Sequence, residues 1–219
     1  MKQVKAFVRR LKICMRLLLA TAILMMSASP VSAGIRQVGP NLYQAGIYTV
    51  TFSTARQKGN FWCWAACIEM VLKFHGMEIS QESMVAKIHG SLVDKAGNSM
   101  QILQALTGTG PNAAGGTSAV YAEGYTGLYH YFIQDLINGY PLIVGLNYGT
   151  NIGHAVVLTA VSFSSDMMGR YYPISVVVRD PWPDSPDRQE IPFQAFIQGC
   201  FFSARVGAYP YNNTAPPNK

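Results

Sequence analysis

Residues 57–67, QKGNFWCWAAC, decide the fold of this chain and contain its most informative chemistry. They place Gln57 six positions before Cys63, which opens an apolar segment. From Cys63 to Phe74 the apolar residues recur at i, i+3 and i+4, and His75-Gly76 follows as a stop, so the pattern predicts a buried helix over 63–74. A thiol in the first helical turn meets unpaired backbone N–H groups and the positive end of the macrodipole, which favour a thiolate. The stretch therefore predicts a nucleophilic Cys63.

Residues 1–33 have the pattern of a secretory signal peptide. Six basic residues accompany an apolar core over 17–26, and Val31-Ser32-Ala33 is a small-residue cleavage site before Gly34. A retained membrane anchor is the less favoured alternative, because the apolar run is well short of the roughly 20 residues that a spanning helix needs. We expect export to the periplasm or out of the cell, with no membrane association after cleavage.

Removal of this segment changes the charge of the chain. The whole sequence has 17 Lys and Arg against 11 Asp and Glu, a formal net charge of +6. The six basic residues leave with the segment and no acidic residue does, so 11 residues of each sign remain. The basicity belongs to the targeting segment, and we exclude a nucleic-acid partner on that ground.

The remaining residues are enough for one domain with a sizeable core, which we expect over 34–206, followed by a flexible polar tail over 207–219. Periodicity and turn residues predict helices over 63–74, 80–89, 99–106 and 129–138, strands over 47–52, 141–146, 155–163 and 174–178, and a long loop over 107–125. The first helices precede the main strands along the chain. This order predicts an α+β fold with an N-terminal helical layer.

Four histidines are candidates for a base that would serve Cys63. His75 and His89 each precede a glycine at an expected helix C-terminus, where a cationic ring is favoured for structural reasons. His130 lies between two tyrosines at a helix start and is expected to be a surface or packing residue. His154 differs because it opens a strand after a glycine, so only small neighbours surround the ring. We therefore predict His154 as the base.

Two further polar residues complete the predicted set. Asp180 ends a valine-rich strand and precedes Pro181-Trp182-Pro183, a rigid turn that would hold its carboxylate beside His154 and orient the ring. The alternative is that Asp180 only begins a turn or pairs with Arg179. Gln57 is a side-chain amide donor that, with the backbone N–H of Cys63, would form an oxyanion hole.

The cysteines outside the signal segment are Cys63, Cys67 and Cys200. An exported protein usually pairs its cysteines in an oxidising compartment. If Cys63 is the working thiol, Cys67 and Cys200 remain as a disulfide that would tie the first helix to the C-terminal segment. The alternative is that all three are buried thiols.

At these residues the chain resembles the papain-like cysteine peptidase superfamily. The matching pieces are Gln57, Cys63-Trp64-Ala65, Gly153-His154-Ala155 and Asp180-Pro181-Trp182-Pro183, in the family's order of glutamine, cysteine, histidine and Asn or Asp. The segment over 63–67 is most similar to the bacterial avirulence-protease branch, with the bacteriocin-processing peptidases next. The resemblance implies a helical layer packed on a C-terminal antiparallel sheet, with the active-site cleft between them.

The same resemblance implies a mechanism. Cys63 would attack a peptide carbonyl to form an acyl-enzyme, His154 would take and return the proton, Asp180 would orient His154, and Gln57 would hold the oxyanion. A protein or peptide is the implied substrate, and no cofactor is expected.

Three other hypotheses use the same residues differently. A cell-wall amidase or endopeptidase, or a transglutaminase-like acyltransferase, would share the chemistry up to the acyl-enzyme. A binding domain would keep a dead papain-like site, although all of its functional positions are filled here. A zinc site would use Cys63 and Cys67 with His154 or Asp180, but the spacing suggests no fourth ligand and leaves Gln57 without a role.

Overall fold

The computed structural model describes residues 33–48, 54–125, 131–149 and 153–210. Its helices in this part are α2 (Cys63–Phe74), α3 (Gln81–His89), α4 (Ser99–Ala105), α5 (Tyr131–Ile137) and α6 (Phe193–Gly199). Its strands are β1 (Ala33–Gly39), β2 (Leu42–Ile47), β3 (Gly108–Pro111), β4 (Thr117–Tyr125), β5 (Leu142–Leu146), β6 (His154–Ser165), β7 (Tyr171–Arg179), β8 (Gln189–Pro192) and β9 (Cys200–Pro210). The expected signal peptide up to residue 32 and His130 lie outside the described residues.

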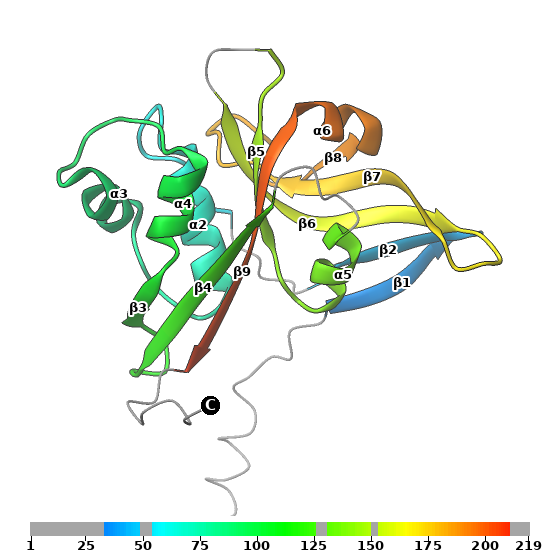
Figure 1. Cartoon of the computed structure of the whole chain (residues 1–219), viewed down its shortest axis with the longest axis horizontal. Coiled ribbons are helices and arrows are strands. Elements are labelled where there is room, and N and C mark those ends of the chain that lie inside the picture. The colour runs from blue at the N-terminus through cyan, green and yellow to red at the C-terminus, as the bar shows by residue number, and fades with distance from the viewer. Residues whose placement is uncertain (1–32, 49–53, 126–130, 150–152, 211–219) are drawn as a thin grey trace, which may run out of the picture. The chain divides into compact units, whose positions relative to one another are not determined.

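The strands in the described part form one antiparallel sheet, with β6 as its centre (Figure 1). The first half of β6 pairs with β5, its second half pairs with β2, and β7 pairs along its other edge. Beyond these strands, β5 continues through β9 and β4 to β3, β2 continues to β1, and β7 continues to β8. The long β6 strand therefore links every arm of the sheet.

Helix α2 anchors the helical layer. Nine of its 12 residues are buried, and it packs against β5 and β6 as well as against α3 and α4. Figure 1 shows α2, α3 and α4 grouped on one side of the sheet. Both α2 and α3 have the bounds that the periodicity predicts, and the side chain of Ser80 caps α3 by accepting from Ser83 N. The expected helical layer on an antiparallel sheet is confirmed.

The N-terminus of α2 is held by a residue from a distant loop. No side chain caps the helix at Trp62. Instead the carboxylate of Asp94 accepts from the backbone N–H groups of Asn60 at 3.0 Å and Phe61 at 2.8 Å. The indole N–H groups of Trp62 and Trp64 donate to carbonyls of the same loop. These four bonds fix the approach of the chain to the first turn of α2, where backbone N–H groups otherwise have no helical partner.

The prediction of a long loop over 107–125 is wrong, because β3 and β4 form an antiparallel hairpin there. Its glycines are packing residues as well as turn residues. A Cβ on Gly110 would lie 2.8 Å from Ile79 Cδ1, and a Cβ on Gly124 would lie 2.9 Å from Leu103 Cδ1. Glycine allows these strands to approach neighbouring side chains closely, which a composition-based loop prediction misses.

The prediction that the flexible tail begins at residue 207 is also wrong, because β9 continues to Pro210. Residues 207–210 belong to β9, where Gly207 pairs with Tyr121 of β4, and the ring of Tyr121 covers the glycine. The rest of the predicted tail, 211–219, lies outside the described residues. Strand β8 and helix α6 were not predicted from the sequence. No helix in the described part is long and apolar enough to cross a membrane.

Candidate active site

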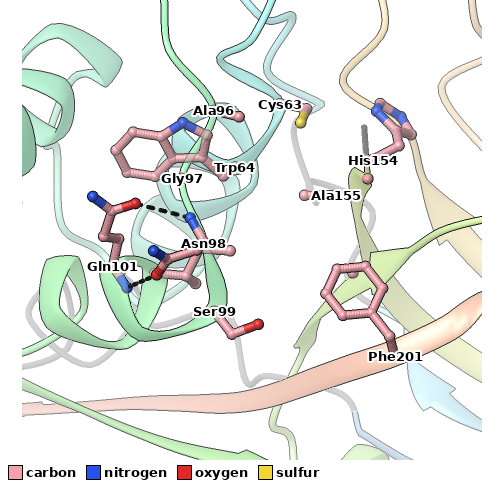
Figure 2. A pocket seen from close by; sticks show the side chains of 13 residues that line it. Cys63, Trp64, Ala96, Gly97, Asn98, Ser99, Gln101, His154, Ala155 and Phe201 are labelled. Carbon is pink, nitrogen blue, oxygen red and sulfur yellow. Dashed lines mark hydrogen bonds between the residues drawn. The ribbon is translucent and has the colours of Figure 1, made fainter. Parts of the chain in front are cut away.

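A cavity of about 380 Å³ lies between the helical layer and the sheet. Trp64, Asn98 and Gln101 line it on the helical side, and His154 and Phe201 line it on the sheet side (Figure 2). Cys63 and His154 face each other at one end of the cavity. The fold therefore opens a cleft where the sequence places its two most reactive residues.

Small residues let the aromatic walls of this cleft form. A Cβ on Gly97 would lie 2.7 Å from Trp64 Cδ2, and a Cβ on Gly145 would lie 2.7 Å from Phe201 Cζ. Phe201 keeps 49% of its surface exposed although it packs on these backbones. The cleft thus has an exposed aromatic face opposite the polar side chains of α4.

Cys63 is the first residue of α2 and is 9% exposed. Its backbone N–H belongs to the first helical turn, whose amides have no acceptor within the helix. The macrodipole at this end favours negative charge on the sulfur and on any oxygen bound beside it. This position suits a nucleophile.

His154 and Asp180 are joined by a hydrogen bond of 2.8 Å between Nε2 and Oδ1. His154 begins β6 and Asp180 follows the last residue of β7, so the pairing of these two strands brings them to the same edge of the sheet. The Asp180 carboxylate also accepts from Trp182 N at 2.8 Å and from Ser185 Oγ at 3.1 Å. Because Asp180 accepts from Nε2, Nδ1 is the ring nitrogen left to serve Cys63.

The alternative pairing of Asp180 with Arg179 is not formed. Arg179 donates through a guanidinium nitrogen to the carbonyl of Asp187 at 3.2 Å. Adjacent residues at a strand end point to opposite faces, so the two side chains diverge. Arg179 therefore does not compete with His154 for the Asp180 carboxylate.

The electrostatics of the three residues are coupled. Burial opposes the charged ring, but hydrogen bonds to Asp180 and to Cys63 raise the pKa of His154 to about 9. Burial likewise opposes the Asp180 anion, yet the hydrogen bond from His154, with that from Trp182 N, lowers the pKa of the carboxyl group. At neutral pH the histidine is therefore a cation between the carboxylate and the thiol.

Gln57 lies next to this group but does not line the cleft. Its side chain is buried, and Nε2 donates to the carbonyls of Gly59 and Asn60 at 2.9 Å each. Its Oε1 atom is buried and has no hydrogen-bond partner among the described residues. The backbone N–H of Gln57 donates to Pro181 O at 2.9 Å, which places the residue against the turn that follows Asp180. Both amide hydrogens therefore face the loop before Cys63.

The expected disulfide between Cys67 and Cys200 is a wrong prediction, since no bond joins them in the described part of the chain. Cys67 is fully buried on α2, where burial first, and then the nearby Cys63 and Asp180, raise the pKa of its thiol well above the usual range. Cys200 opens β9, and burial raises its pKa to about 11. The two thiols have different surroundings, because Cys67 is close to Cys63 and Asp180 whereas Cys200 donates to Phe202 O.

The other described histidines, His75 and His89, make packing and backbone contacts outside the cleft. His75 Nε2 lies 2.9 Å from Val206 O, and burial lowers the pKa of the ring. His89 meets the Trp64 ring edge-on. Among the described residues, no three His, Cys, Asp or Glu side chains gather where they could hold a metal ion.

Sequence reasoning did not identify the cleft walls. Phe201, Asn98 and Gln101 carry no recognisable spacing relative to Cys63, because they reach the cleft through tertiary packing of β9 and α4. The quoted motifs did contain three other residues that line the cleft, Trp64, Gly153 and Ala155.

The sequence pattern of the Peptidase_C39 like family matches residues 49–207. The chain belongs to this family. A comparison with curated proteins gives no match. Among solved structures, the peptidase domain of Streptococcus ComA, a bi-functional ABC transporter involved in a quorum sensing pathway, is similar with a TM-score of 0.50 and 16% sequence identity. That match covers 73% of this chain and 99% of the ComA domain, and it shows the shared fold.

The family and the fold make this C39-like chain a cysteine peptidase of the papain-like superfamily. The superfamily inferred from the sequence is thus confirmed. Its finer assignment to the avirulence-protease branch stays a prediction.

The hydrogen bond to Asp180 predicts how His154 titrates. Replacement of Asp180→Asn in this C39-like peptidase removes the anion, so the pKa of His154 should fall from about 9. In the parent the folded ring holds its proton more tightly than the unfolded ring. This contribution to stability is complete below about pH 6.5 and is lost as the pH rises through about 9, and the variant should lose it.

The measurement is an NMR titration of the histidine Cε1–H signals, with urea unfolding at several pH values. Asp184→Asn, an exposed carboxylate in the same turn, is the matched control. An unchanged His154 titration in Asp180→Asn would show that the carboxylate does not hold the ring.

Proposed function

We propose that the chain hydrolyses peptide bonds with Cys63 as nucleophile, His154 as general base and acid, and Asp180 as the residue that orients His154. The observation that supports this most is the position of the His154 ring, bonded to Asp180 at 2.8 Å through Nε2 and facing Cys63 across the cleft. A nucleophile, a base within reach and a third group that orients the base are the arrangement that covalent catalysis needs. The sequence spacing and the geometry support the same three residues.

The proposed catalytic steps follow from the positive charge on the His154 ring. A ring with a pKa of about 9 is protonated at neutral pH, so His154 places a positive charge beside the sulfur of Cys63. In the proposed mechanism the reacting form of Cys63 is the thiolate paired with this imidazolium. The sulfur attacks the peptide carbonyl carbon, the C–N bond breaks, and His154 returns the proton to the leaving amine. Water then adds to the thioester, with His154 taking its proton, and the C–S bond breaks to release the acid and restore the Cys63 thiolate beside the protonated ring.

Two donors are proposed for the oxyanion hole, the backbone N–H of Cys63 and the side-chain amide of Gln57. The N–H of Cys63 lies at the positive end of α2, beside the attacking sulfur. The Gln57 amide is bonded to Gly59 O and Asn60 O in the free protein, so it must share a hydrogen or turn when substrate binds. Its buried, unpaired Oε1 indicates that this side-chain arrangement is not fully satisfied, which favours such a change.

The substrate that the family indicates is a protein or peptide. The cleft fits an extended chain whose one side meets the aromatic face of Phe201 and whose other side meets Asn98 and Gln101. We propose that substrate side chains at this point are apolar on the sheet side.

Cys63→Ala should abolish catalysis, with a fall in peptide hydrolysis of at least about 10³-fold, because the covalent step is lost. Iodoacetamide at about pH 5.5, followed by peptide mass spectrometry, should label Cys63 alone in the parent, since a thiol without a lowered pKa is almost fully protonated there. Cys67 and Cys200 should stay unlabelled because their thiol pKa values are raised.

Cys200→Ala is the matched control and should keep both labelling and hydrolysis, while His154→Ala should slow the labelling of Cys63. Slow labelling of Cys63 in the parent would contradict the activated thiolate. Fast labelling without hydrolysis of any peptide would leave the thiolate intact and direct the search to other acyl donors.

Gln57→Ala should lower kcat by about 10²–10³-fold if its amide stabilises the oxyanion. The rate of Cys63 alkylation should not change, because the thiolate depends on His154 rather than on an oxyanion donor. Gln104→Ala, an exposed glutamine of α4, is the control. Parallel losses of alkylation, kcat and thermal stability would instead indicate that Gln57 only holds the Gly59–Asn60 loop.

We also propose that residues 1–33 direct export, so that the protein acts in the periplasm or outside the cell. The sequence pattern supports this proposal, because basic residues and an apolar core precede the small-residue site Val31-Ser32-Ala33. N-terminal peptide mapping of the exported protein should find Gly34 as the first residue, and Leu18→Arg in the apolar core should block export. Leu92→Arg, at an exposed site, is the control. An exported protein that retains residues 1–33 would contradict the proposal.

A further inference from the structure

A second cavity, of about 270 Å³, shares no residue with the cleft and is lined by three arginines. Arg36, Arg179 and Arg188 surround it, and none of the described residues that line it is acidic. The other lining residues are Gln44, Ile47, Tyr48, Thr159, Ala160 and Val177. Three guanidinium groups around one polar hollow make a site of strong positive potential.

The sheet places these arginines on its outer face. Val176 and Val178 belong to the hydrophobic core, so the alternation of β7 directs Val177 and Arg179 to the opposite face. In the β1–β2 pair Arg36 lies opposite Gln44, on the same face of the sheet.

Strands β2 and β6 approach each other closely at Ala160, which lines the cavity. A Cβ on Gly46 would lie only 2.7 Å from Ala160 Cβ, so the strands β2 and β6 meet here without a side chain between them. Arg36 lies over the ring of Tyr48, with its Cζ atom 3.0 Å from the ring centroid. The aromatic ring supports the guanidinium at the rim of the cavity.

The closeness of Arg179 to Arg188 is electrostatically unfavourable. The β7–β8 pairing ends at Val178 and Gln189, and Arg179 and Arg188 are the next residues beyond this pair on the two segments. Their like charges repel each other. Burial and then the charge of Arg188 lower the pKa of Arg179, while Asp187 acts in the other direction. The Nε atom of Arg179 is buried and has no hydrogen-bond partner among the described residues.

The carboxylates of Asp187 and Glu190 are close in sequence to Arg188 but do not line the cavity. Asp187 pairs with Arg56 at 2.5 Å and offers Arg179 only its backbone carbonyl. Glu190 accepts from Ser175 Oγ at 2.6 Å. The positive charge of the cavity is therefore not balanced by a lining side chain.

We propose that this cavity binds a tetrahedral oxyanion of at least two negative charges, either free phosphate or the phosphoryl group of a larger molecule. Guanidinium groups present paired N–H donors that match phosphate oxygens, and several of them fit a multiply charged anion better than a single carboxylate. A bound anion would accept from the guanidinium groups that line the cavity and offset the repulsion between Arg179 and Arg188. The inference is independent of the peptidase chemistry.

Isothermal titration calorimetry with sodium phosphate tests the proposal, at constant ionic strength set with sodium chloride and with the full protein. Saturable binding at one site is expected. Arg36→Gln and Arg188→Gln, both at exposed positions, should each weaken phosphate binding about tenfold or more, because each removes charge-assisted hydrogen bonds. Arg170→Gln removes an exposed arginine that pairs with Asp166 outside the cavity, and it should bind phosphate like the parent.

Thermal unfolding gives a second measure, since phosphate at ten times its Kd should raise the Tm by about 3–6 °C. Phosphate and sulfate also stabilise proteins by exclusion from their surface, so the decisive quantity is the difference between the cavity variants and Arg170→Gln. Cys63→Ala should bind phosphate unchanged, which separates this proposal from the peptidase mechanism.

Two arms distinguish the source of the anion. Equal affinity for phosphate and glycerol 3-phosphate supports a free anion, and markedly tighter binding of glycerol 3-phosphate supports the phosphoryl group of a larger molecule. Heats that do not saturate, or equal weakening in Arg170→Gln and Arg188→Gln, would overturn the proposal.

Discussion

The hydrogen bond between His154 and Asp180 depends on strand register, and the candidate site depends on that bond. The two residues are 26 positions apart and meet because β6 and β7 are antiparallel neighbours. The pairing shifts between Leu158 and Ala160, where an extra residue lies in β6. A bulge of this kind re-aims the side chains on one side of it, and a slip by one residue would turn Asp180 to the other face of the sheet. The register therefore sets the charge state of His154 as well as its position.

A second set of contacts ties the nucleophile to this pair. Arg56 donates to the carbonyls of Asp180 at 3.1 Å and Trp182 at 2.8 Å, and the backbone of Gln57 donates to Pro181. The segment that leads into α2 is thus fastened to the turn that begins with Asp180. Because Cys63 follows this segment by a few residues, the helical layer and the sheet are aligned at the point where the thiol and the imidazole must meet. A cleft between two layers gains its catalytic precision from such bonds more than from the packing of the layers.

Local patterns in the sequence were enough for helices α2 and α3 and for the choice of Cys63, His154 and Asp180. The spacing of apolar residues after Cys63 and the cap at Ser80 are determined within a few positions, so α2 and α3 were predicted with their bounds. The surroundings of His154 and Asp180 were also local, a glycine before one and a rigid turn after the other. These features need no knowledge of distant contacts.

The features that were missed depend on contacts between distant segments. The β3–β4 hairpin has the glycines of a loop, and only the side chains of Ile79 and Leu103 explain why glycine is needed there. The disulfide prediction rested on parity of the cysteines, whereas no disulfide joins Cys67 to Cys200 in the described part of the chain. The support that Asp94 gives to α2 joins residues more than 30 positions apart, and no spacing rule reveals it.

The arrangement that serves His154 also explains the unbalanced charge of the arginine cavity. If Arg179 shared a face with Asp180, its guanidinium would compete with His154 for the carboxylate and weaken the support for the imidazolium. Strand alternation prevents this, and Arg56 takes the other nearby carboxylate, Asp187, in order to hold the turn. Asp180, which follows Arg179 in the sequence, and Asp187, which precedes Arg188, therefore both make contacts that support the candidate active site. The positive charge of Arg179 and its neighbour Arg188 must then be balanced from solution, by counterions or by a bound oxyanion, on the face of the sheet that the peptidase chemistry does not use.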